Sequence, residues 1–421
     1  VEAPQFFGTL TPQSMAEVNL KYRRAVGAVM TANFLLFWAV PVAAMGQLWK
    51  LALQYPLRPL FKLMDQSRLL RAFAEKYIYA KPKYADFFAI SLLVTLSAVA
   101  NLAFVFWYQM SYGRLAWWVI YTHNFIWVGL GGRTMGAAYT LAHKEGHNAM
   151  MYKKPVRDTI GNFFEDGLGV FFGSVPGNFT TSHVHIHHKL NGGKGDTFYQ
   201  WDLDRTSWSD LMLFQHRILL HMTGFSSLRY FKNAGKDKMA QKLKHGMFMY
   251  WVVYPLCIFA ATRSLSFIFW IYLQPLFCMT YFLAFINFGF HAFIEFDENG
   301  KHVACVNSTC IIEGEDDYYG EDDHMAHHYA TSVFYADLPA HQKSQIDEWR
   351  KHKASVFRKL SIVELSLFIL LKEWDRLADV YVDFSDEKMS RDEIKAMLKA
   401  RAERKEISST EYIKSMEERK S

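Results

Sequence analysis

The stretch LSFIFWIYLQPLFCMTYFLAFINFGF, residues 265–290, contains no charged side chain. A helix needs about 20 apolar residues to cross the hydrocarbon core of a bilayer, so this stretch is long enough for one crossing. A second apolar run, 246–262, precedes it, and only Arg263 and Ser264 separate the two runs. Such a short connection returns the chain at once and therefore predicts a helical hairpin in a membrane.

Three further apolar runs precede this pair. Residues 86–108 and 115–132 are joined by the short polar turn 109–114 and predict another membrane hairpin. Residues 26–48 carry no formal charge and predict an additional N-terminal helix, for which an interfacial or buried position is the alternative. The predicted fold class is therefore an all-α, multi-pass helical membrane protein with two hairpins and one extra hydrophobic helix.

The composition agrees with a membrane protein that has large polar loops. Hydrophobic residues make up 51% of the chain and gather in blocks, while the charged residues gather between those blocks. The net charge of +6 is mild, and we find no basic run with interleaved aromatic residues, so nucleic acid is not an expected partner. Four cysteines are too few for a disulfide framework.

The charges also predict an orientation. The loop 143–245 contains many Lys and Arg residues, whereas each hairpin turn contains a single Arg. By the positive-inside rule this loop faces the cytosol or its organellar equivalent, and two returning hairpins place everything after residue 290 on that side. A helical cap on this side is expected. The sequence leaves the endoplasmic reticulum and an organelle such as the mitochondrial inner membrane both open.

The chain is predicted to consist of four consecutive segments. These are an N-terminal extension over 1–85, a membrane domain over 86–330, cap helices over 331–384 and a charged helical tail over 385–421.

The tail carries its own helix signals. Ser390 and Glu393 form a capping-box pattern, and Ile394, Met397 and Leu398 then recur at helical spacing. Because the tail is so polar, we expect that it does not bury itself on the core of its own chain. The hypothesis is that a protein partner, such as a larger membrane assembly, holds it. The alternative is docking on the cap through the apolar stripe.

Histidines gather at the predicted cytosolic ends of the apolar runs. HKEGH occupies 143–147, HVHIHH occupies 183–188, NFGFH occupies 287–291 and HMAHH occupies 324–328. Side chains three or four positions apart share one face of a helix, so several rings of one motif can reach one ion. Imidazole suits iron, copper, zinc or nickel, and nine histidines are enough for two ions. Two nitrogen-rich iron sites would suit dioxygen activation.

These motifs, in this order, resemble the integral-membrane di-iron fatty acid desaturase and hydroxylase superfamily over about residues 86–330. The resemblance implies that Asn287 orients a metal-bound water. In the second motif the spacing is H-x3-H-H from His183, and His185 remains the alternative first ligand. The implied ligands of two iron ions are His143, His147, His183, His187, His188, His291, His324, His327 and His328.

The resemblance implies an oxidoreductase that uses dioxygen and external electrons to desaturate an acyl chain of a membrane lipid or an acyl-CoA. We find no H-P-G-G motif of a fused b-type cytochrome, so a separate b-type cytochrome or ferredoxin is the expected electron donor. Glu145 and the acidic run 313–323 are candidates to orient the histidines. Two alternatives stay open: an acyl or alkane hydroxylase with the same site, and a non-catalytic subunit of a membrane complex.

Overall fold

Helices account for most of the chain. The strands found in the described ranges are β1 (Cys310–Ile312) and β2 (Val356–Arg358), which pair in parallel with Cys310 opposite Val356. The helical content predicted for the fold class is therefore confirmed. The computed structural model describes residues 12–41, 44, 55–128, 133–148, 150–314 and 319–418.

The chain divides into two units, and each is described by itself. The division falls inside α1 (Pro12–Phe34), α10 (Trp208–Met222) and α15 (Gln274–Phe290). The units therefore cut across the four consecutive segments expected from the sequence. Unit 1 takes in the described parts of 1–31, 191–217 and 283–421, and unit 2 takes in those of 32–190 and 218–282.

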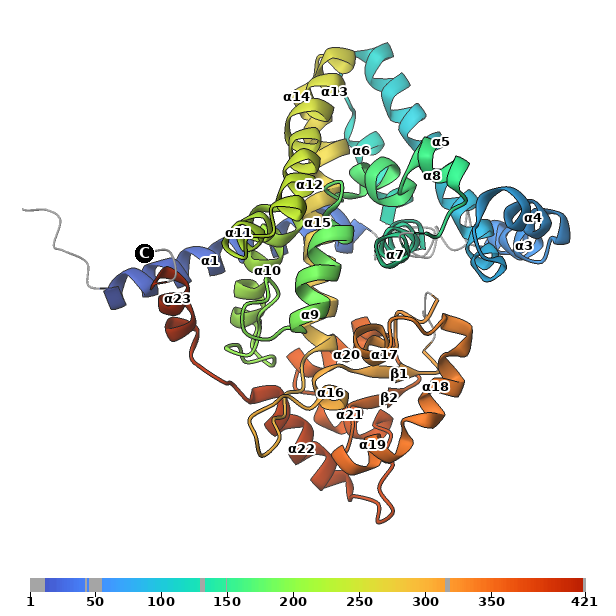
Figure 1. Ribbon diagram of the computed structural model, residues 1–421. Helices are drawn as coiled ribbons and strands as arrows, with labels where there is room; N and C mark the ends of the chain where they lie inside the picture. Colours follow the sequence, from blue (N-terminus) through green and yellow to red (C-terminus); the bar gives the residue numbers. More distant parts are fainter. Residues whose placement is uncertain are drawn as a thin grey trace, which may run out of the picture. The chain divides into compact units, whose positions relative to one another are not determined.

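Unit 2 contains most of the long apolar helices, including the whole of Phe88–Tyr112 and Tyr254–Thr262 and the first half of α15 (Figure 1). Its α-helices are α3 (Tyr55–Asp65), α4 (Arg68–Phe73), α5 (Phe88–Tyr112), α6 (Trp117–Val128), α7 (Arg133–His147), α8 (Lys154–Ile160), α9 (His188–Leu190), α11 (Phe225–Asn233), α12 (Asp237–Phe248), α13 (Tyr254–Thr262) and α14 (Leu265–Phe267). Its π-helical and 3-10 segments are η1 (Leu35–Ala39), η3 (Ala74–Ile78), η4 (Pro82–Phe87), η5 (Phe163–Gly167), η6 (Leu168–Phe172), η7 (Phe179–His187), η8 (Met249–Val253) and η9 (Ile268–Leu273). Helix α7 contacts both η5 and η7.

Among the described residues, three helices are long and apolar enough to cross a membrane: Pro82–Tyr112, Asp237–Thr262 and Leu265–Phe290. They contain three of the five apolar runs expected to span. The described part of the run 115–132 forms α6 with 12 residues, about 18 Å at the rise of a helix, which is shorter than a bilayer core. Residues 129–132 lie outside the described residues.

The expected N-terminal helix over 26–48 is also not among these candidates. Its described part belongs to α1 and η1, and residues 42–43 and 45–48 lie outside the described residues. Within unit 1, the Thr31 hydroxyl contacts the side chain of Gln215. This polar contact shows that one face of α1 packs on protein.

Two of the long helices contain a π-helical turn just before a proline. Pro255 follows η8 and Pro275 follows η9. Proline has no N–H to donate, and its ring clashes with the carbonyl four residues earlier, here that of Trp251 or Ile271. A wider π turn at those carbonyls relieves the clash, which explains why the helices continue through both prolines.

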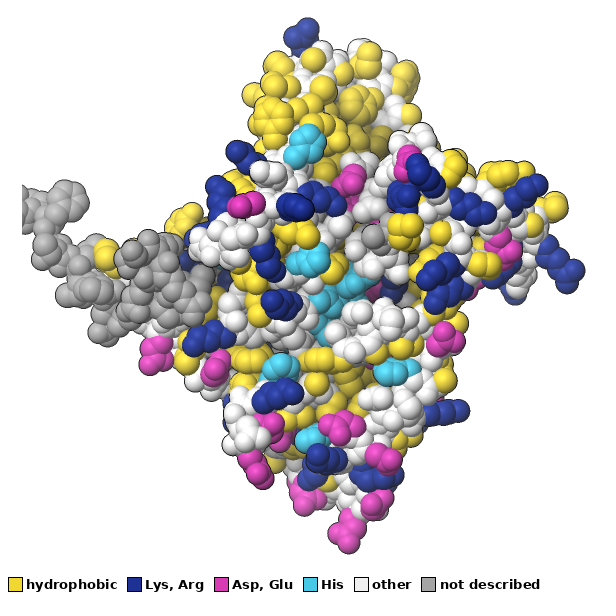
Figure 2. All heavy atoms as spheres, in the orientation of Figure 1, with side chains coloured by type: hydrophobic (Ala, Val, Ile, Leu, Met, Phe, Trp, Pro, Cys, Tyr) yellow, Lys and Arg dark blue, Asp and Glu magenta, His cyan; other side chains and the backbone are white. Residues whose placement is uncertain are grey.

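The α13–α14 end of unit 2 has an apolar surface. Figure 2 shows hydrophobic side chains over most of the upper region where Figure 1 labels α13 and α14. Leu256 and Leu265 are exposed on these elements, and Trp107 is exposed on α5. Soluble surfaces rarely carry large continuous apolar patches, so this surface is typical of contact with lipid or protein.

Unit 1 has a core of its own, made from the segments after residue 289 (Figure 1). The fully buried side chains of Val356 and Phe357 on β2 lie in this core together with Leu365 on α20 and Leu377 on α21. Its further elements are α16 (Ala304–Asn307), α17 (His324–Tyr329), η10 (Tyr335–Asp337), α18 (Leu338–Ser344), α19 (Ile346–His352), α20 (Ile362–Leu370), α21 (Trp374–Val380), α22 (Arg391–Glu403) and α23 (Ser409–Glu418).

The tail packs into the core of unit 1. Ile394 and Leu398 on α22 are buried in it, and Met397 packs against it. The expectation that the tail would not bury itself on its own chain is therefore wrong, because one apolar stripe suffices to dock an otherwise polar helix. The capping box is confirmed, since the Ser390 hydroxyl accepts from the Glu393 amide and the Glu393 carboxylate accepts from the Ser390 amide.

A glycine fixes the close approach of α12 to the loop before η7. A Cβ added at Gly246 would lie 1.8 Å from the carbonyl oxygen of Pro176, so any side chain there must push the two backbones apart.

We expect Gly246→Ala to lower the melting temperature strongly, because overpacking costs about 1–3 kcal/mol or more when backbone must move. Gly113→Ala is the matched control. Its φ is +70° in the left-handed region, and nothing lies within 4 Å of the added Cβ, so only the backbone penalty of about 1–2 kcal/mol applies and the melting temperature should fall less. Equal melting temperatures for the two variants, measured by differential scanning fluorimetry, would contradict the close approach.

Candidate metal centre

In unit 2, the last two turns of α7 present two histidines on one face. His143 and His147 are four residues apart, and their ring centroids lie 4.8 Å apart. Gly146 lies beside Phe179 at the start of η7, where an added Cβ would come within 2.9 Å of the Phe179 Cβ. The glycine of the HKEGH motif thus lets α7 approach η7 closely enough for their histidines to meet.

The second motif is wound as a π-helix. Segment η7 covers Phe179–His187, and the amide of His188 donates to the carbonyl of His183, five residues earlier. Residues five apart therefore lie one above the other, so His183 and His188 share a face. In an α-helix the same H-x3-H-H spacing would pair His183 with His187. The π-helical turn instead brings His183 next to His188.

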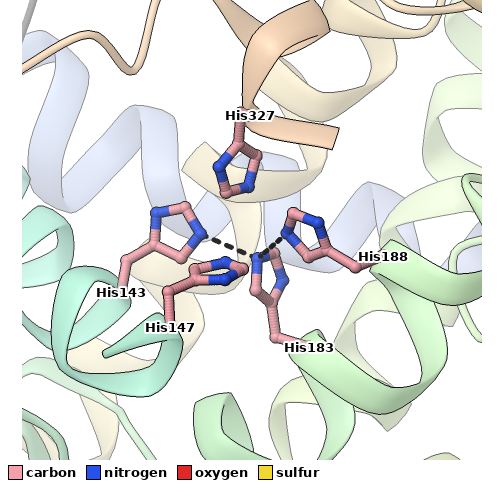
Figure 3. Close-up of side chains that lie close together, drawn as sticks. All are labelled: His143, His147, His183, His188 and His327. Carbon is pink, nitrogen blue, oxygen red and sulfur yellow. Dashed lines mark hydrogen bonds between the residues drawn. The ribbon is translucent and has the colours of Figure 1, made fainter. Parts of the chain in front are cut away.

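The four rings converge on one point. Nε2 of His183 lies 2.8 Å from Nε2 of His143 and 3.0 Å from Nε2 of His188. The rings of His147 and His188 are 4.4 Å apart, and one ligand atom from each of the four histidines lies within 4.8 Å of the others. Figure 3 shows the ring nitrogens turned inward; it also labels His327, which belongs to unit 1 and is treated there.

These nitrogen spacings fit a shared cation. A neutral imidazole nitrogen holds one proton or one lone pair, so Nε2 of His183 can hydrogen-bond well with only one of its two neighbours. Imidazole nitrogens bind a metal at about 2.1 Å, so two of them at right angles on one ion lie roughly 3 Å apart. The distances between the His183 nitrogen and its neighbours agree with that value.

Burial keeps the central ring of this cluster neutral. His143 and His183 are 3% and 5% exposed. Burial, followed by the adjacent imidazoles of His143 and His188, lowers the pKa of His183 well below its ordinary value. Neutral imidazole is the form that binds a metal, so His183 need not lose a proton first.

Unit 1 carries a separate cluster. His291 follows the end of α15, and His324 and His328 lie four residues apart on α17. Nε2 of His324 lies 2.9 Å from Nε2 of His291 and 3.1 Å from Nε2 of His328, and all three residues are buried. Asp323 caps α17, because its carboxylate accepts from the Ala326 amide at 2.8 Å.

The backbone of Asn307 orients His291. Nδ1 of His291 lies 2.8 Å from the carbonyl oxygen of Asn307, and this contact requires the proton on Nδ1. Nε2 of His291 then presents a lone pair toward His324 and His328. This is the tautomer that ligates through Nε2 with its other nitrogen held by an oxygen. No signal in the sequence pointed to Asn307.

Three further predicted site residues are His187, His327 and Asn287, and each lies near one of the histidines already described or close to it in the sequence. The ring of His187 lies 5.4 Å from that of His183, and the ring of His327 lies 5.4 Å from those of His324 and His328. Asn287 is 9% exposed, and within the described residues its Oδ1 has no hydrogen-bond partner.

His185 lies apart from these groups. It is half-buried, and burial followed by the charges of Lys236 and Lys242 lowers its pKa. The groups of ligand atoms found in the described residues contain His183 and not His185.

Glu145 supports the site through the backbone. Its carboxylate accepts from the Tyr152 hydroxyl at 2.6 Å and from the amides of Phe164 and Glu165 at 2.8 and 2.9 Å. Burial raises the pKa of Glu145 to about 8. Its described hydrogen bonds thus join α7 to η5 and do not reach a histidine. In the acidic run 313–323, residues 315–318 lie outside the described residues.

Comparisons with protein-family models, with curated proteins and with solved structures found no match for this chain. The two histidine clusters that could hold metal and the three long apolar helices are therefore the features on which a function can be argued.

Proposed function

We propose that the chain is a membrane-bound di-iron oxidoreductase that desaturates a lipid acyl chain. The observation that carries the proposal is the convergence of Nε2 atoms in two separate clusters, with spacings of 2.8–3.1 Å. One ion is assigned to the cluster of His143, His147, His183 and His188, and one to that of His291, His324 and His328. His187 and His327 complete the nine ligands.

The proposed arrangement in the membrane is based on the three candidate spans. In the proposal, Asp237–Thr262 and Leu265–Phe290 form one transmembrane hairpin, and Pro82–Tyr112 pairs with α6 in another. Helix α5 contacts α6, as that pairing requires. The histidine motifs and the cap then lie on the cytosolic side or its organellar equivalent, and the localisation is a multi-pass protein of the endoplasmic reticulum or of an organelle.

Two iron ions, when bound, would supply dioxygen activation, which redox-inert zinc cannot. The acyl chain loses two hydrogens, and dioxygen takes these together with two external electrons and two protons to give two waters. The carbonyl of Asn307 would hold His291 in its ligating tautomer, and the chain buries His143, His183, His291, His324 and His328 from water. Asn287, one turn before His291, is placed to accept from a water.

The electrons come from a separate b-type cytochrome or ferredoxin in this proposal, and the substrate is a membrane lipid or an acyl-CoA. Expression in a host lacking the activity, followed by lipid mass spectrometry and iron analysis, tests it. The expected product is lighter by two hydrogens. A gain of one oxygen would identify a hydroxylase instead. Unchanged lipids, with iron bound and a competent reductant supplied, would identify a non-catalytic subunit.

A further inference from the structure

Helices α11 and α12 of unit 2 carry a basic surface that none of the metal chemistry uses. Residues 225–248 contain six Lys or Arg residues and a single acidic residue, Asp237. Five of the six basic residues are exposed, and Lys236 is half-buried beside the Tyr230 ring. The basic residues are Arg229, Lys232, Lys236, Lys238, Lys242 and Lys244.

The protein leaves most of the charge on this surface unpaired. Within the described residues, none of the six basic side chains forms an ion pair with a carboxylate. The acidic groups near them are Asp237 and Asp166, and the latter acts on Lys242 at longer range. In Figure 2, Lys and Arg side chains stand over the region where Figure 1 labels α11 and α12. A surface of this kind attracts anions.

The basic surface lies at one end of a candidate membrane span. Helix α12 runs without a break through η8 into α13, and the whole of Asp237–Thr262 has 26 residues. At the rise of a helix this is about 39 Å, whereas the hydrocarbon core is about 30 Å thick. About six residues therefore extend beyond the core, which places Lys238 and Lys242 at the depth of the phosphate groups.

Aromatic side chains agree with that depth. Phe225 at the start of α11 and Phe248 at the end of α12 are 56% and 55% exposed. With Lys242 at the depth of the phosphate groups, Phe248 lies six residues farther along the same helix, about 9 Å toward the acyl chains, where an exposed apolar ring is expected.

The surface is also fixed relative to the histidine cluster of unit 2. Gly246 places α12 against Pro176, and the Lys242 side chain packs against Gly177, where a Cβ would lie 3.3 Å from its Cε. Helix α12 contacts η7, which carries His183. A ligand held on α12 is therefore held beside the segment that carries the second histidine motif.

We infer that α11 and α12 form a binding surface for the head groups of anionic phospholipids. The inference rests on the membrane placement in the proposed function. Clusters of four to eight basic residues next to a membrane helix bind acidic lipids, and each Lys or Arg near the surface adds to the affinity. The apolar rings and the depth of the lysines select a lipid phosphate over a free one.

The test uses the full chain in detergent micelles containing phosphatidylglycerol or phosphatidylcholine, with retained lipid counted by native mass spectrometry. The variant Lys238→Gln/Lys242→Gln/Lys244→Gln should bind phosphatidylglycerol at least about tenfold more weakly, given the contribution of each Lys. Phosphatidylcholine retention should not change. The matched control, with the same loss of charge from exposed residues of unit 1, is Lys343→Gln/Lys351→Gln/Lys399→Gln.

Equal loss of phosphatidylglycerol in the two triple variants would overturn the inference. Displacement of phosphatidylglycerol by equimolar inorganic phosphate would also overturn it, since the surface would then bind free anions. Iron is measured on the same samples. Lipid selectivity without iron would refute the di-iron proposal alone, and iron without lipid selectivity would refute the lipid surface alone.

Discussion

His183→Ala is expected to remove the metal of the unit 2 cluster, lowering iron from about two ions per chain to about one, since nine imidazoles are more than one ion can use. His183 is the residue whose Nε2 contacts the nitrogens of both His143 and His188, at 2.8 and 3.0 Å. Without it the remaining three rings lose their central ligand. Iron is counted by mass spectrometry of the purified chain, and acyl desaturation is expected to disappear.

His185→Ala is the matched control for His183→Ala. It removes an imidazole two residues away in the same π-helical segment, and His185 is half-buried beside Lys236 and Lys242. We expect full iron content from this variant. The opposite pattern, with iron lost from His185→Ala and kept by His183→Ala, would refute the assigned cluster.

A folding defect is separable from loss of a ligand. A bound ion stabilises the native state by about 4 kcal/mol when its concentration is a thousandfold above the dissociation constant. After chelation, His183→Ala and the parent protein should therefore melt at similar temperatures. Before chelation the parent, with two ions, should be stabilised more than the variant, which keeps only the ion of the unit 1 cluster. A low melting temperature for His183→Ala after chelation would point to misfolding.

The helical content and the identity of the clustered histidines could be predicted from the sequence, because both depend on local patterns. Residues 246–262 and 265–290 were apolar over the length of a membrane helix, and the structure forms candidate spans there. His324 and His328 are four apart and share a face of α17, as α-helical spacing predicts.

The pairing within the second motif could not be predicted in the same way. Spacing translates into contact only if the helix type is known, and η7 is a π-helix that pairs His183 with His188. The π-helix places a wider turn where η7 meets α7, next to Gly146. Because that contact is tertiary, periodicity could not reveal it. The carbonyl of Asn307 was equally hidden, since every residue carries a carbonyl.

The tail shows the limit of judging a segment by its mean polarity. Segment 385–421 is highly charged, yet Ile394, Leu398 and Ala402 place one continuous stripe in the core of unit 1. The helix needs only that stripe, and most of its charged residues stay exposed. Arg401 is the buried exception, and its guanidinium donates to the carbonyls of His352 and Lys353. A partner is therefore not required to hold this helix in place.

The C-terminal end of α22 also completes the hydrogen bonds of a buried cation. Arg205 is fully buried, and its guanidinium donates to the carbonyls of Arg401 and Arg404 in the tail, at 3.0 and 2.6 Å. Its Nε donates to the carbonyl of Ala292, the residue after His291. Burial lowers the pKa of Arg205 to about 9. Without the tail this cation would lose two acceptors and become costly to bury.

Leu398→Ala is therefore expected to destabilise the chain by about 2–5 kcal/mol, the range for a fully buried leucine, and to lower its melting temperature clearly. Lys399→Ala, which removes an exposed side chain from the next position of α22, should change stability by less than about 0.5 kcal/mol.

Deleting 385–421 should give a chain that aggregates. If the truncated chain instead stayed folded with iron bound and moved on a native gel from a large complex to a small one, the tail would be held by a partner. The apolar stripe of α22 and the carbonyls that accept from Arg205 would then not be needed for folding. That result would contradict the stabilising role inferred for the packing of α22 in the core of unit 1.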